Sequence, residues 1–331
     1  MIILPLYFIY QNWKIHIKTD KMKITCVEPL GISEKHFEEL RQEFKAQGHE
    51  FCYFMNRDES PETLIERMKE SDIVIISNIK LTAEVINACP NLKMLSVAFT
   101  GLDHIDLACC QQRNIEVRNA AGYSTTAVSE LAVALMLDVL RKVSEFNAAT
   151  RNGGCRGNFL GRELKGKTVG VVGTGAIGTA TIRLLLAFGC KIMAFSRTKR
   201  PDVAALGVDY VSLDTLMSQS DIVTLHVPLN NETRHIVGEH ELSLMKPSAI
   251  LINTARGNVV DIEALAKALK EGRIAGAGID VFETEPPLPQ SHTLLSAPNC
   301  VVVPHIAYAT REAFDIRADI VFDNVRNFLN K

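Results

Sequence analysis

The sequence predicts an α/β fold made of two parallel-sheet domains, one of them inserted into a discontinuous other. Three observations support this fold class. Short apolar runs rich in β-branched residues alternate with helical patterns along most of the chain, which is typical of parallel sheets covered by helices. A glycine-rich turn at 173–178 follows one of these runs directly. With 331 residues, the chain is long enough to form two cores.

The first predicted domain covers residues 22–120 and receives the chain end, 306–331, as a second piece. Its predicted strands lie at 23–27, 73–76, 94–97 and 115–117, with a helix such as 82–89 between them. The stretch 119–122, Asn-Ala-Ala-Gly, is turn-like and closes the first piece. An amphipathic helix is predicted at 311–329, and we expect it to return to this domain.

A long helix is predicted at 125–144. Its apolar residues follow the i, i+3, i+4, i+7 rhythm, and further apolar residues widen the stripe. We therefore expect this helix to be buried on more than one side, at an inter-domain or inter-subunit position. An inter-subunit position of this helix would favour a homodimer. The following segment, 151–161, is glycine-rich and polar and predicts an exposed loop.

The second predicted domain covers residues 121–305, where the alternation of strands and helices is stronger. Predicted strands lie at 168–172, 191–195, 222–225, 249–253, 274–279 and 300–303, and predicted helices at 177–188 and 262–269. Residues 1–21 precede the first regular strand and are interpreted as an N-terminal extension. The apolar stretch 1–10 within it is far shorter than the roughly 20 residues that span a bilayer.

Composition excludes several function classes. The net charge of −2 provides no basic surface for nucleic acid or an anionic membrane. The eight cysteines are scattered without C-x-x-C spacing, which favours reduced thiols and a cytoplasmic location. Asp103, His104 and Asp106 lack partners at zinc-like spacing, so we expect a local turn and no metal there.

The glycine-rich turn predicts a dinucleotide site and makes the second domain Rossmann-like. Its pattern is G-x-G-x-x-G, placed between a strand and a helix, which is a specific context for this otherwise common motif. Gly173 permits the tight turn, Gly175 lets the backbone approach a pyrophosphate, and Gly178 lets the helix pack on the strand. Ala176 and Ile177 begin the helix whose N-terminus faces the phosphates. The alternative is a purely structural β–α turn.

The end of the next strand indicates which dinucleotide binds. An NAD site usually carries an acidic residue here that bonds both ribose hydroxyls, and the segment 196–200 contains none. Ser196 and Thr198 offer hydroxyls, while Arg197, with Lys199 or Arg200, offers a cation for a 2′-phosphate. We therefore favour NADP over NAD as cofactor. The alternative is a solvated basic turn.

Several ordered motifs show that the chain resembles the D-isomer-specific 2-hydroxyacid dehydrogenase family. They are Gly-Leu-Asp-His-Ile-Asp at 101–106, the glycine loop, Asn-Thr-Ala-Arg-Gly at 253–257, the segment 278–286, and Pro-His at 304–305. The resemblance covers nearly everything from Met22 onward. It implies two Rossmann-like domains with the active site in the cleft between them, and a homodimer.

The resemblance places the family's catalytic residues on Arg256, Glu285 and His305. Reduction of a 2-keto acid requires a hydride at the carbonyl carbon and a proton at its oxygen. A histidine is the residue type whose charge changes near neutral pH, so a histidine at position 305 suits the proton transfer, and Glu285 would orient its ring and favour the protonated form. Arg256 has a planar fork that suits the substrate carboxylate and keto oxygen. Singly, each of these residues has an ordinary structural explanation.

The resemblance also carries over the binding residues. Asp280 matches the aspartate that meets the nicotinamide carboxamide. The remaining expected cofactor contacts are Thr125, His226, Val227, Pro228, Thr254, Ala255, Arg256 and His305, in addition to the glycine loop and Ser196, Arg197 and Thr198. The expected substrate-binding residues are Asn78, Thr100, Gly101, Arg256, His305 and Tyr308.

Departures from the family pattern limit the substrate. Phosphoglycerate-oxidising relatives carry arginines in the loop at 76–80, which here has one lysine only. Formate dehydrogenases have Gln where this chain has Glu285. Tyr308 stands where many relatives have glycine and resembles D-lactate-type relatives. No regulatory domain follows Lys331, so we expect none of the feedback-controlled long forms.

The expected function is NAD(P)H-dependent reduction of a small 2-keto acid, such as glyoxylate or hydroxypyruvate, to the D-2-hydroxy acid, and the reverse reaction. A rival hypothesis is a dinucleotide-sensing binding protein or co-repressor with little turnover. An alanine-dehydrogenase-type enzyme shares the dinucleotide domain, but the motif order argues against it.

Overall fold

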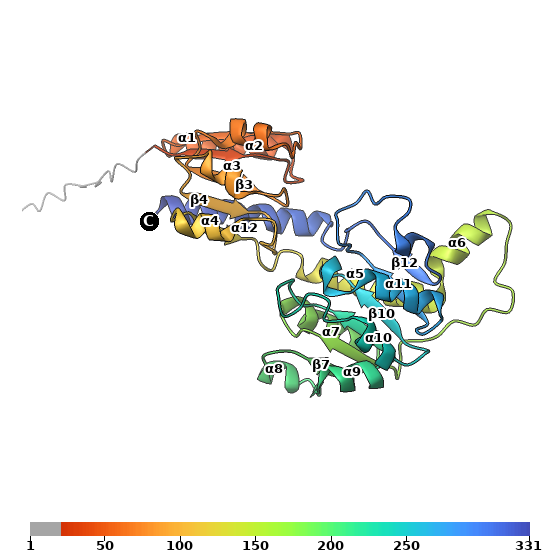
Figure 1. Ribbon diagram of the computed structural model, residues 1–331. Coiled ribbons are helices and arrows are strands. Elements are labelled where there is room, and N and C mark those ends of the chain that lie inside the picture. Colours follow the sequence, from red (N-terminus) through yellow and green to blue (C-terminus); the bar gives the residue numbers. More distant parts are fainter. Residues whose placement is uncertain (1–20) are drawn as a thin grey trace, which may run out of the picture.

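The computed structural model describes residues 21–331, which form two α/β domains (Figure 1). The predicted extension at 1–21 therefore lies, apart from Lys21, outside the described residues and stays a prediction. The predicted fold class is confirmed, because each domain contains one sheet in which all described strand pairs are parallel.

The first domain contains a five-stranded sheet in the order β2-β1-β3-β4-β5. Its strands are β1 (Lys23–Cys26), β2 (Glu50–Tyr53), β3 (Ile73–Ile76), β4 (Met94–Val97) and β5 (Glu116–Asn119). Its first helices are α1 (Glu34–Ala46), α2 (Pro61–Met68), α3 (Ala83–Asn87) and α4 (Leu107–Gln112). The central strands β3 and β4 are buried along their whole length, as expected for parallel strands covered on both faces.

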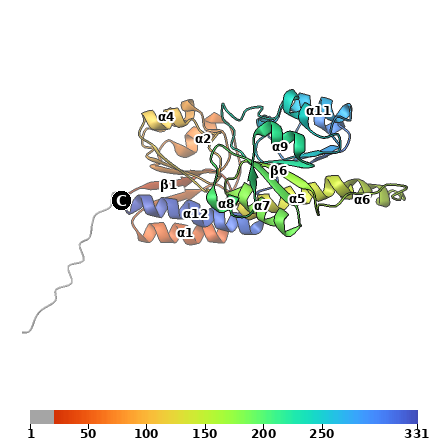
Figure 2. The ribbon, with the colours of Figure 1, turned by 90° about the horizontal axis from the view of Figure 1, so that it is seen from below.

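The C-terminal helix α12 (Arg311–Leu329) packs against this first sheet, as predicted, and lies beside α1 in Figure 2. Phe322 of α12 enters an aromatic cluster with Phe37, Phe44 and Phe51, at ring-centroid distances of 6.5, 6.4 and 5.9 Å. Arg326 adds a two-point ion pair to Glu43 of α1, at 2.7 and 2.8 Å. The end of the chain is thus part of the first domain's core.

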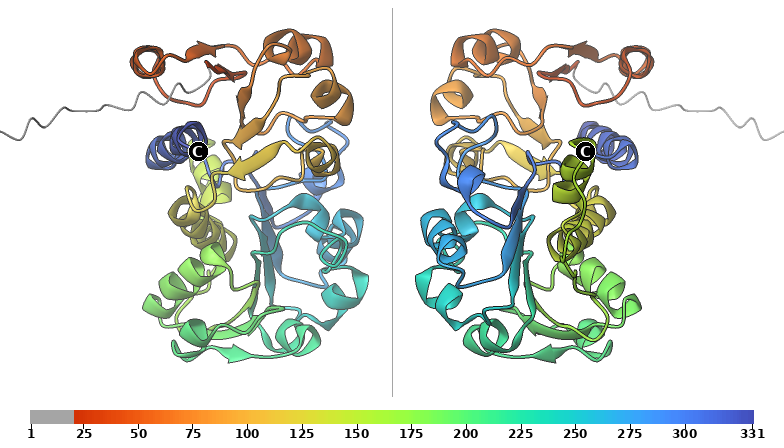
Figure 3. Two further views of the ribbon diagram at one scale, coloured as in Figure 1. Left: turned by 90° about the vertical axis from the view of Figure 1, so that its left-hand side faces the viewer. Right: turned by 90° about the vertical axis from the view of Figure 1, so that its right-hand side faces the viewer.

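The second domain contains a seven-stranded sheet in the order β12-β11-β10-β9-β6-β7-β8, which Figure 3 shows nearly edge-on between two layers of helices. Its strands are β6 (Thr168–Val172), β7 (Lys191–Phe195), β8 (Asp209–Tyr210), β9 (Ile222–Leu225), β10 (Ile250–Asn253), β11 (Gly276–Ile279) and β12 (Cys300–Val302). Its helices are α5 (Thr125–Arg141), α6 (Val143–Arg151), α7 (Ala176–Ala187), α8 (Pro201–Ala204), α9 (Leu213–Gln219), α10 (Glu239–Leu244) and α11 (Ile262–Lys270), with short 3₁₀ turns at Gly257–Val259 and Thr293–Ser296.

Side-chain caps explain where many helices begin. Ser33, Thr82, Asp106, Asp261 and Thr310 each precede a helix and accept a hydrogen bond from a backbone N–H of its first turn. Such a bond satisfies one of the donors that a helix N-terminus leaves unpaired. Asp106 therefore acts as a helix cap, in agreement with the predicted local turn.

The prediction of one helix at 125–144 is wrong at its C-terminal end. Helix α5 stops at Arg141, Lys142 adopts the left-handed conformation with φ 53°, and α6 continues in a new direction. The Asp138 carboxylate accepts the backbone N–H of Ser144 at 2.8 Å and also bonds the Ser144 hydroxyl, which stabilises the break. Helix α6 buries none of its residues and extends away from the domain (Figures 1 and 2).

Smaller differences concern element ends. The strand predicted at 115–117 is observed at Glu116–Asn119, and the strand predicted at 274–279 begins only at Gly276. Within residues 21–331, no helix combines the length and apolar character that crossing a membrane requires.

Candidate active site

A cleft of about 660 Å³ lies between the two domains. It is lined from the first domain by the loop that follows β4, including Thr100 and Gly101, and from the second by the turn before α7 and the segment after β10. The cleft therefore lies at the carboxyl ends of the strands of the second sheet. In open parallel sheets, ligands bind in this position, at the point where the strand order reverses.

The glycine loop forms at this reversal point, between β6 and β9. Gly173 has φ 97°, and a Cβ there would lie 2.5 Å from the carbonyl oxygen of His226. A Cβ on Gly178 would lie 2.0 Å from the Gly173 oxygen. Among the described residues, no side chain caps α7, so its first N–H groups stay available to an anion. This cradle fits a dinucleotide pyrophosphate.

His226 closes the opposite side of the loop. Its ring nitrogen Nε2 lies 3.1 Å from the hydroxyl of Thr224. Burial lowers the pKa of His226 to about 4, so the imidazole is neutral at physiological pH and adds no charge beside the phosphates.

Ser196, Arg197 and Thr198 follow β7 outside the cleft lining. The Arg197 side chain is 85% exposed and contacts the Glu232 carboxylate at 3.4 Å. Arg200 is held elsewhere, because its Nε and Nη2 bond Asp202 at 3.1 and 2.6 Å. Of the three basic side chains after β7, Arg197 and Lys199 therefore remain exposed at the surface.

His305 and Glu285 form a close pair at the second domain's edge of the cleft. The His305 Nδ1 lies 2.9 Å from both carboxylate oxygens of Glu285. That hydrogen bond, with the nearby positive charges, lowers the pKa of the Glu285 carboxyl and keeps it ionised. We therefore assign a proton to Nδ1, which donates it to the Glu285 carboxylate. The other ring nitrogen, Nε2, is then the one that can meet a ligand in the cleft.

The backbone places the His305 ring. His305 has a left-handed φ of 54°, and its N–H donates to the Asp280 carbonyl at 2.8 Å. The Asp280 carboxylate is buried and accepts the N–H groups of Ile306 at 2.7 Å and Ala307 at 3.0 Å. Asp280 thus fixes the turn that carries His305, while each of its oxygens keeps a second lone pair.

Arg256 lies across the cleft against the first domain. Its Nε bonds Asp103 at 3.3 Å, and its Nη1 bonds the Ala255 carbonyl at 2.8 Å. A Cβ on Gly101 would lie only 1.9 Å from Arg256 Nη2, so the guanidinium rests directly on the Gly101 backbone. Only glycine at position 101 allows this approach.

An aromatic wall, formed by Phe99 and Tyr308, joins these groups. Phe99 meets His305 edge-on at 6.0 Å and Tyr308 at 5.3 Å, and the Arg256 guanidinium lies 5.4 Å from its ring centre. Sequence reasoning missed Phe99, because an apolar residue after a buried strand reads as ordinary core. Its place two residues before Gly101, in the expected substrate loop, was the available signal.

The structure brings most expected site residues to the cleft and leaves others outside it. Those that line it are Thr100, Gly101, Thr125, Gly175, Ala176, Ile177, His226, Val227, Pro228, Thr254, Ala255, Arg256, His305 and Tyr308. Those outside the lining are Asn78, Gly173, Gly178, Ser196, Arg197, Thr198, Asp280 and Glu285. Of these, Gly173, Gly178, Asp280 and Glu285 support lining groups through the contacts above, and Asn78 bonds Arg57.

Within residues 21–331, no group of His, Cys, Asp and Glu side chains is arranged to hold a metal ion. Asp103 and Asp106 serve instead as the partner of Arg256 and the cap of α4.

Comparison with known proteins identifies the family. Residues 133–307 match the family model for the D-isomer specific 2-hydroxyacid dehydrogenase, NAD binding domain. A glyoxylate reductase of Thermococcus litoralis is 44% identical over 275 residues, which are 80% of this chain and 82% of that protein.

Two solved structures show the same fold. An acyclic imino acid reductase in complex with NADPH and D-Arg aligns with a TM-score of 0.84 and 32% identity, over 93% of this chain and 97% of that one. A D-lactate dehydrogenase from Aquifex aeolicus, complexed with NAD and lactic acid, aligns with a TM-score of 0.81 and 31% identity, over 93% and 95%. The motifs, the fold and these similarities together establish that the chain belongs to the D-isomer-specific 2-hydroxyacid dehydrogenase family of oxidoreductases.

Proposed function

We propose that this protein reduces a small 2-keto acid, glyoxylate or hydroxypyruvate, to the D-2-hydroxy acid, with NADPH as the preferred cofactor. The observation that carries the proposal is the meeting of three groups at one cleft. These are the His305–Glu285 pair, the Arg256 guanidinium resting on Gly101, and the glycine loop. The relative from Thermococcus litoralis is named a glyoxylate reductase, which supports the substrate class.

In this mechanism both domains hold the substrate carboxylate, and the second domain acts on its carbonyl. The backbone N–H groups of the Thr100–Gly101 loop and the Arg256 fork bind the carboxylate, since a bidentate guanidinium fits a planar anion. Arg256 also stabilises the negative charge that develops on the keto oxygen. Phe99 and Tyr308 pack beside the reacting carbon and exclude water.

When bound, the reduced nicotinamide supplies a hydride to carbon 2 of the keto acid. His305 donates its Nε2 proton to the carbonyl oxygen, so the carbonyl becomes a secondary alcohol and the imidazole is left neutral. Glu285 keeps the ring oriented and stabilises its protonated form before transfer. Asp280 holds the turn of His305, and from the family resemblance we assign its remaining lone pairs to the nicotinamide carboxamide.

The cofactor preference rests on the residues after β7. Ser196, Arg197 and Thr198 provide two hydroxyls and one exposed cation, and no acidic residue lies at 196–200 to repel a 2′-phosphate. Glu232, which contacts Arg197 here, would have to release it. Related folds are solved with NADPH and with NAD, so these side chains, rather than the fold, decide the choice.

We further propose that the domain boundaries fall at 120/121 and 305/306, and that the enzyme is a cytoplasmic homodimer. The projecting helix α6, which buries none of its own residues, is the surface we assign to the partner copy. Light scattering after gel filtration should give twice the mass of one chain.

Initial rates of NADPH and NADH oxidation with glyoxylate, hydroxypyruvate, pyruvate and phenylpyruvate test the function. We expect turnover of glyoxylate or hydroxypyruvate, faster with NADPH at limiting concentration. His305→Asn should abolish turnover and retain cofactor binding. Absence of turnover across the panel, with NADPH still bound, would refute the proposed function.

A further inference from the structure

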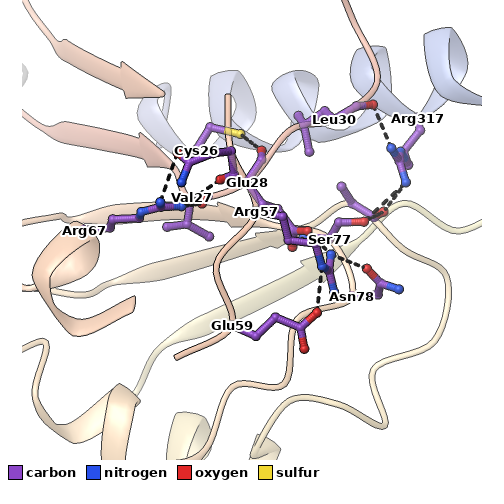
Figure 4. A network of polar contacts seen from close by, with 12 residues as sticks. Cys26, Val27, Glu28, Leu30, Arg57, Glu59, Arg67, Ser77, Asn78 and Arg317 are labelled. Atoms are coloured by element: carbon purple, nitrogen blue, oxygen red, sulfur yellow. Dashed lines mark hydrogen bonds and ion pairs between the residues drawn. The ribbon is translucent and has the colours of Figure 1, made fainter. Parts of the chain in front are cut away.

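A network of charged and polar side chains occupies the reversal point of the first sheet. In the order β2-β1-β3-β4-β5, β1 lies between β2 and β3, so connections leave its two sides in opposite directions. In open α/β sheets, ligands bind at such a point, beyond the carboxyl ends of the strands. Glu28 follows β1 at this reversal point, and Ser77 and Asn78 follow β3 (Figure 4).

Glu28 is the buried anchor of this network. Its side chain is 2% exposed, forms an ion pair with Arg57, and accepts the backbone N–H of Ser77 at 2.7 Å. A buried carboxylate is tolerated only when it is paired and hydrogen-bonded. Glu28 therefore fixes both Arg57 and the loop that begins at Ser77.

Arg57 and Asn78 present unused donors above this anchor. Arg57 Nη1 donates to the Asn78 side-chain oxygen at 2.9 Å, and its Nε donates to Glu59 at 2.8 Å. This bond assigns the Asn78 amide so that its NH₂ group faces away from Arg57. Neither that NH₂ group nor Arg57 Nη2 has a protein partner among residues 21–331.

The loop that carries Asn78 is fastened to the loop that carries Gly101. The Ser77 hydroxyl donates to the Ala98 carbonyl at 3.2 Å, and the Leu81 N–H donates to the His104 carbonyl at 2.9 Å. The two loops leave adjacent strands, in which Ile76 is paired with Val97. Asn78 therefore lies next to the loop where the substrate carboxylate binds.

The effect of Arg57 on the pKa values of two cleft residues agrees with a position near the substrate. The pKa of the Glu285 carboxyl is lowered first by its hydrogen bond to His305, and the charge of Arg57 adds to the effect. Burial raises the pKa of Tyr308, and Arg57 acts against that rise. Arg57 thus lies within electrostatic reach of both groups beside the reacting carbonyl.

We infer that Arg57, anchored by Glu28, is a specificity-determining residue that extends the expected substrate-facing loop of Asn78 into a subsite for the group on carbon 3, and that it selects a keto acid with a hydrogen-bond acceptor there. This inference rests on the proposed function. Glu28 and Glu59 already balance the charge of Arg57, so the subsite suits a neutral hydroxyl better than a second carboxylate. The oxygen of a 3-hydroxyl can accept the unused N–H groups, whereas a 3-methyl group would leave them desolvated and unpaired.

The test compares hydroxypyruvate with glyoxylate, which has no carbon 3 and serves as an internal control. Arg57→Met should lower kcat/KM for hydroxypyruvate by about 10- to 100-fold, the loss typical of a charged donor. We expect kcat/KM for glyoxylate to change by less than about 3-fold, because only the subsite is altered. Asn78→Ala should also lower the ratio of kcat/KM for hydroxypyruvate to that for glyoxylate, and it keeps the Glu28–Arg57 pair if Arg57→Met fails to fold.

Lys80→Met is the matched control, since it removes an exposed cation from the same loop without touching the network. Its ratio of kcat/KM values for the two substrates should equal that of the wild type. An equal fall for both substrates in the Arg57 and Asn78 variants would mean a structural role and overturn the subsite, as would an unchanged ratio. If the wild type reduced neither keto acid, the proposed function would fail, and the subsite with it.

Discussion

Replacing Gly101 with alanine should separate the position of Arg256 from the stability of the fold. The added Cβ would lie 1.9 Å from Arg256 Nη2 and 2.7 Å from the Asp103 carboxylate. Reaching an ordinary contact of 3.4 Å moves the guanidinium by about 1.5 Å. Because Arg256 Nη2 is the free end of a long side chain, it can move without unfolding the protein.

The expected loss is therefore catalytic. A misplacement of about 1 Å in a substrate-positioning group costs roughly 100-fold, so we expect kcat/KM for glyoxylate to fall by about that factor. The free energy of unfolding should change by less than about 1 kcal/mol, since alanine also restricts the unfolded chain. Steady-state kinetics and urea unfolding measure the two quantities, and fluorescence titration should give an unchanged Kd for NADPH.

Two other glycine-to-alanine variants serve as controls for this prediction. A Cβ on Gly257 would also lie 1.9 Å from its neighbour, but that neighbour is the backbone carbonyl of Phe282. Gly257→Ala should therefore lower the free energy of unfolding by about 3 kcal/mol, because the backbone itself must shift. A Cβ on Gly238 would meet nothing closer than 3.6 Å, so Gly238→Ala should leave kcat/KM unchanged. The reasoning is refuted if Gly101→Ala keeps more than about a third of the wild-type kcat/KM.

Three further predictions concern cofactor, pH and stability. Arg197→Ala should raise KM for NADPH by about 10-fold or more and leave KM for NADH nearly unchanged, because only NADPH carries the 2′-phosphate; equal effects on both cofactors would contradict the assignment. Glu285→Gln should lower kcat for keto-acid reduction, since the carboxylate that holds the His305 ring by Nδ1 is replaced by an amide; an unchanged kcat would exclude this role. Arg326→Met should lower the free energy of unfolding at pH 7 by about 1 kcal/mol. The Arg326 hydrogen bond lowers the pKa of Glu43 below its ordinary 4.5. The difference in unfolding free energy between wild type and variant should therefore shrink as the pH falls from 4.5 through the lower folded-state pKa. A pH-independent difference in urea unfolding would disprove this pairing.

The strands were the most predictable part of the fold. Those at 73–76, 94–97, 168–172, 191–195 and 222–225 are confirmed at both ends, because a buried parallel strand is a short, nearly continuous apolar run with polar residues on either side. The break after α5 could not be predicted in this way. Lys142 is not a residue type typical of the left-handed conformation, and the bond from Asp138 to Ser144 resembles any other polar pair in the sequence.

The site residues also divide into those that a sequence pattern predicts and those that it does not. The glycines of the 173–178 turn follow from local strand–turn–helix geometry. The expected catalytic residues Arg256, Glu285 and His305 follow from ordered motifs. Pairs that form only through the tertiary fold leave no local pattern. The Glu28–Arg57 pair joins segments 29 residues apart, and each residue alone reads as a solvated surface charge.

The contacts of Asp280 determine which part of the active site moves. Since its carbonyl and both carboxylate oxygens bind the N–H groups of three consecutive residues, His305, Ile306 and Ala307, the turn is fixed to the end of β11. We therefore expect bending between the domains on the C-terminal side of Ala307, just beyond the proposed boundary at 305/306, and in the turn near 120–123. The proton donor then belongs to the same rigid body as the hydride donor, and the distance between them is independent of how wide the cleft opens. In the proposed mechanism, the Thr100–Gly101 loop brings the keto acid to this fixed pair, and Arg256 of the second domain receives its carboxylate.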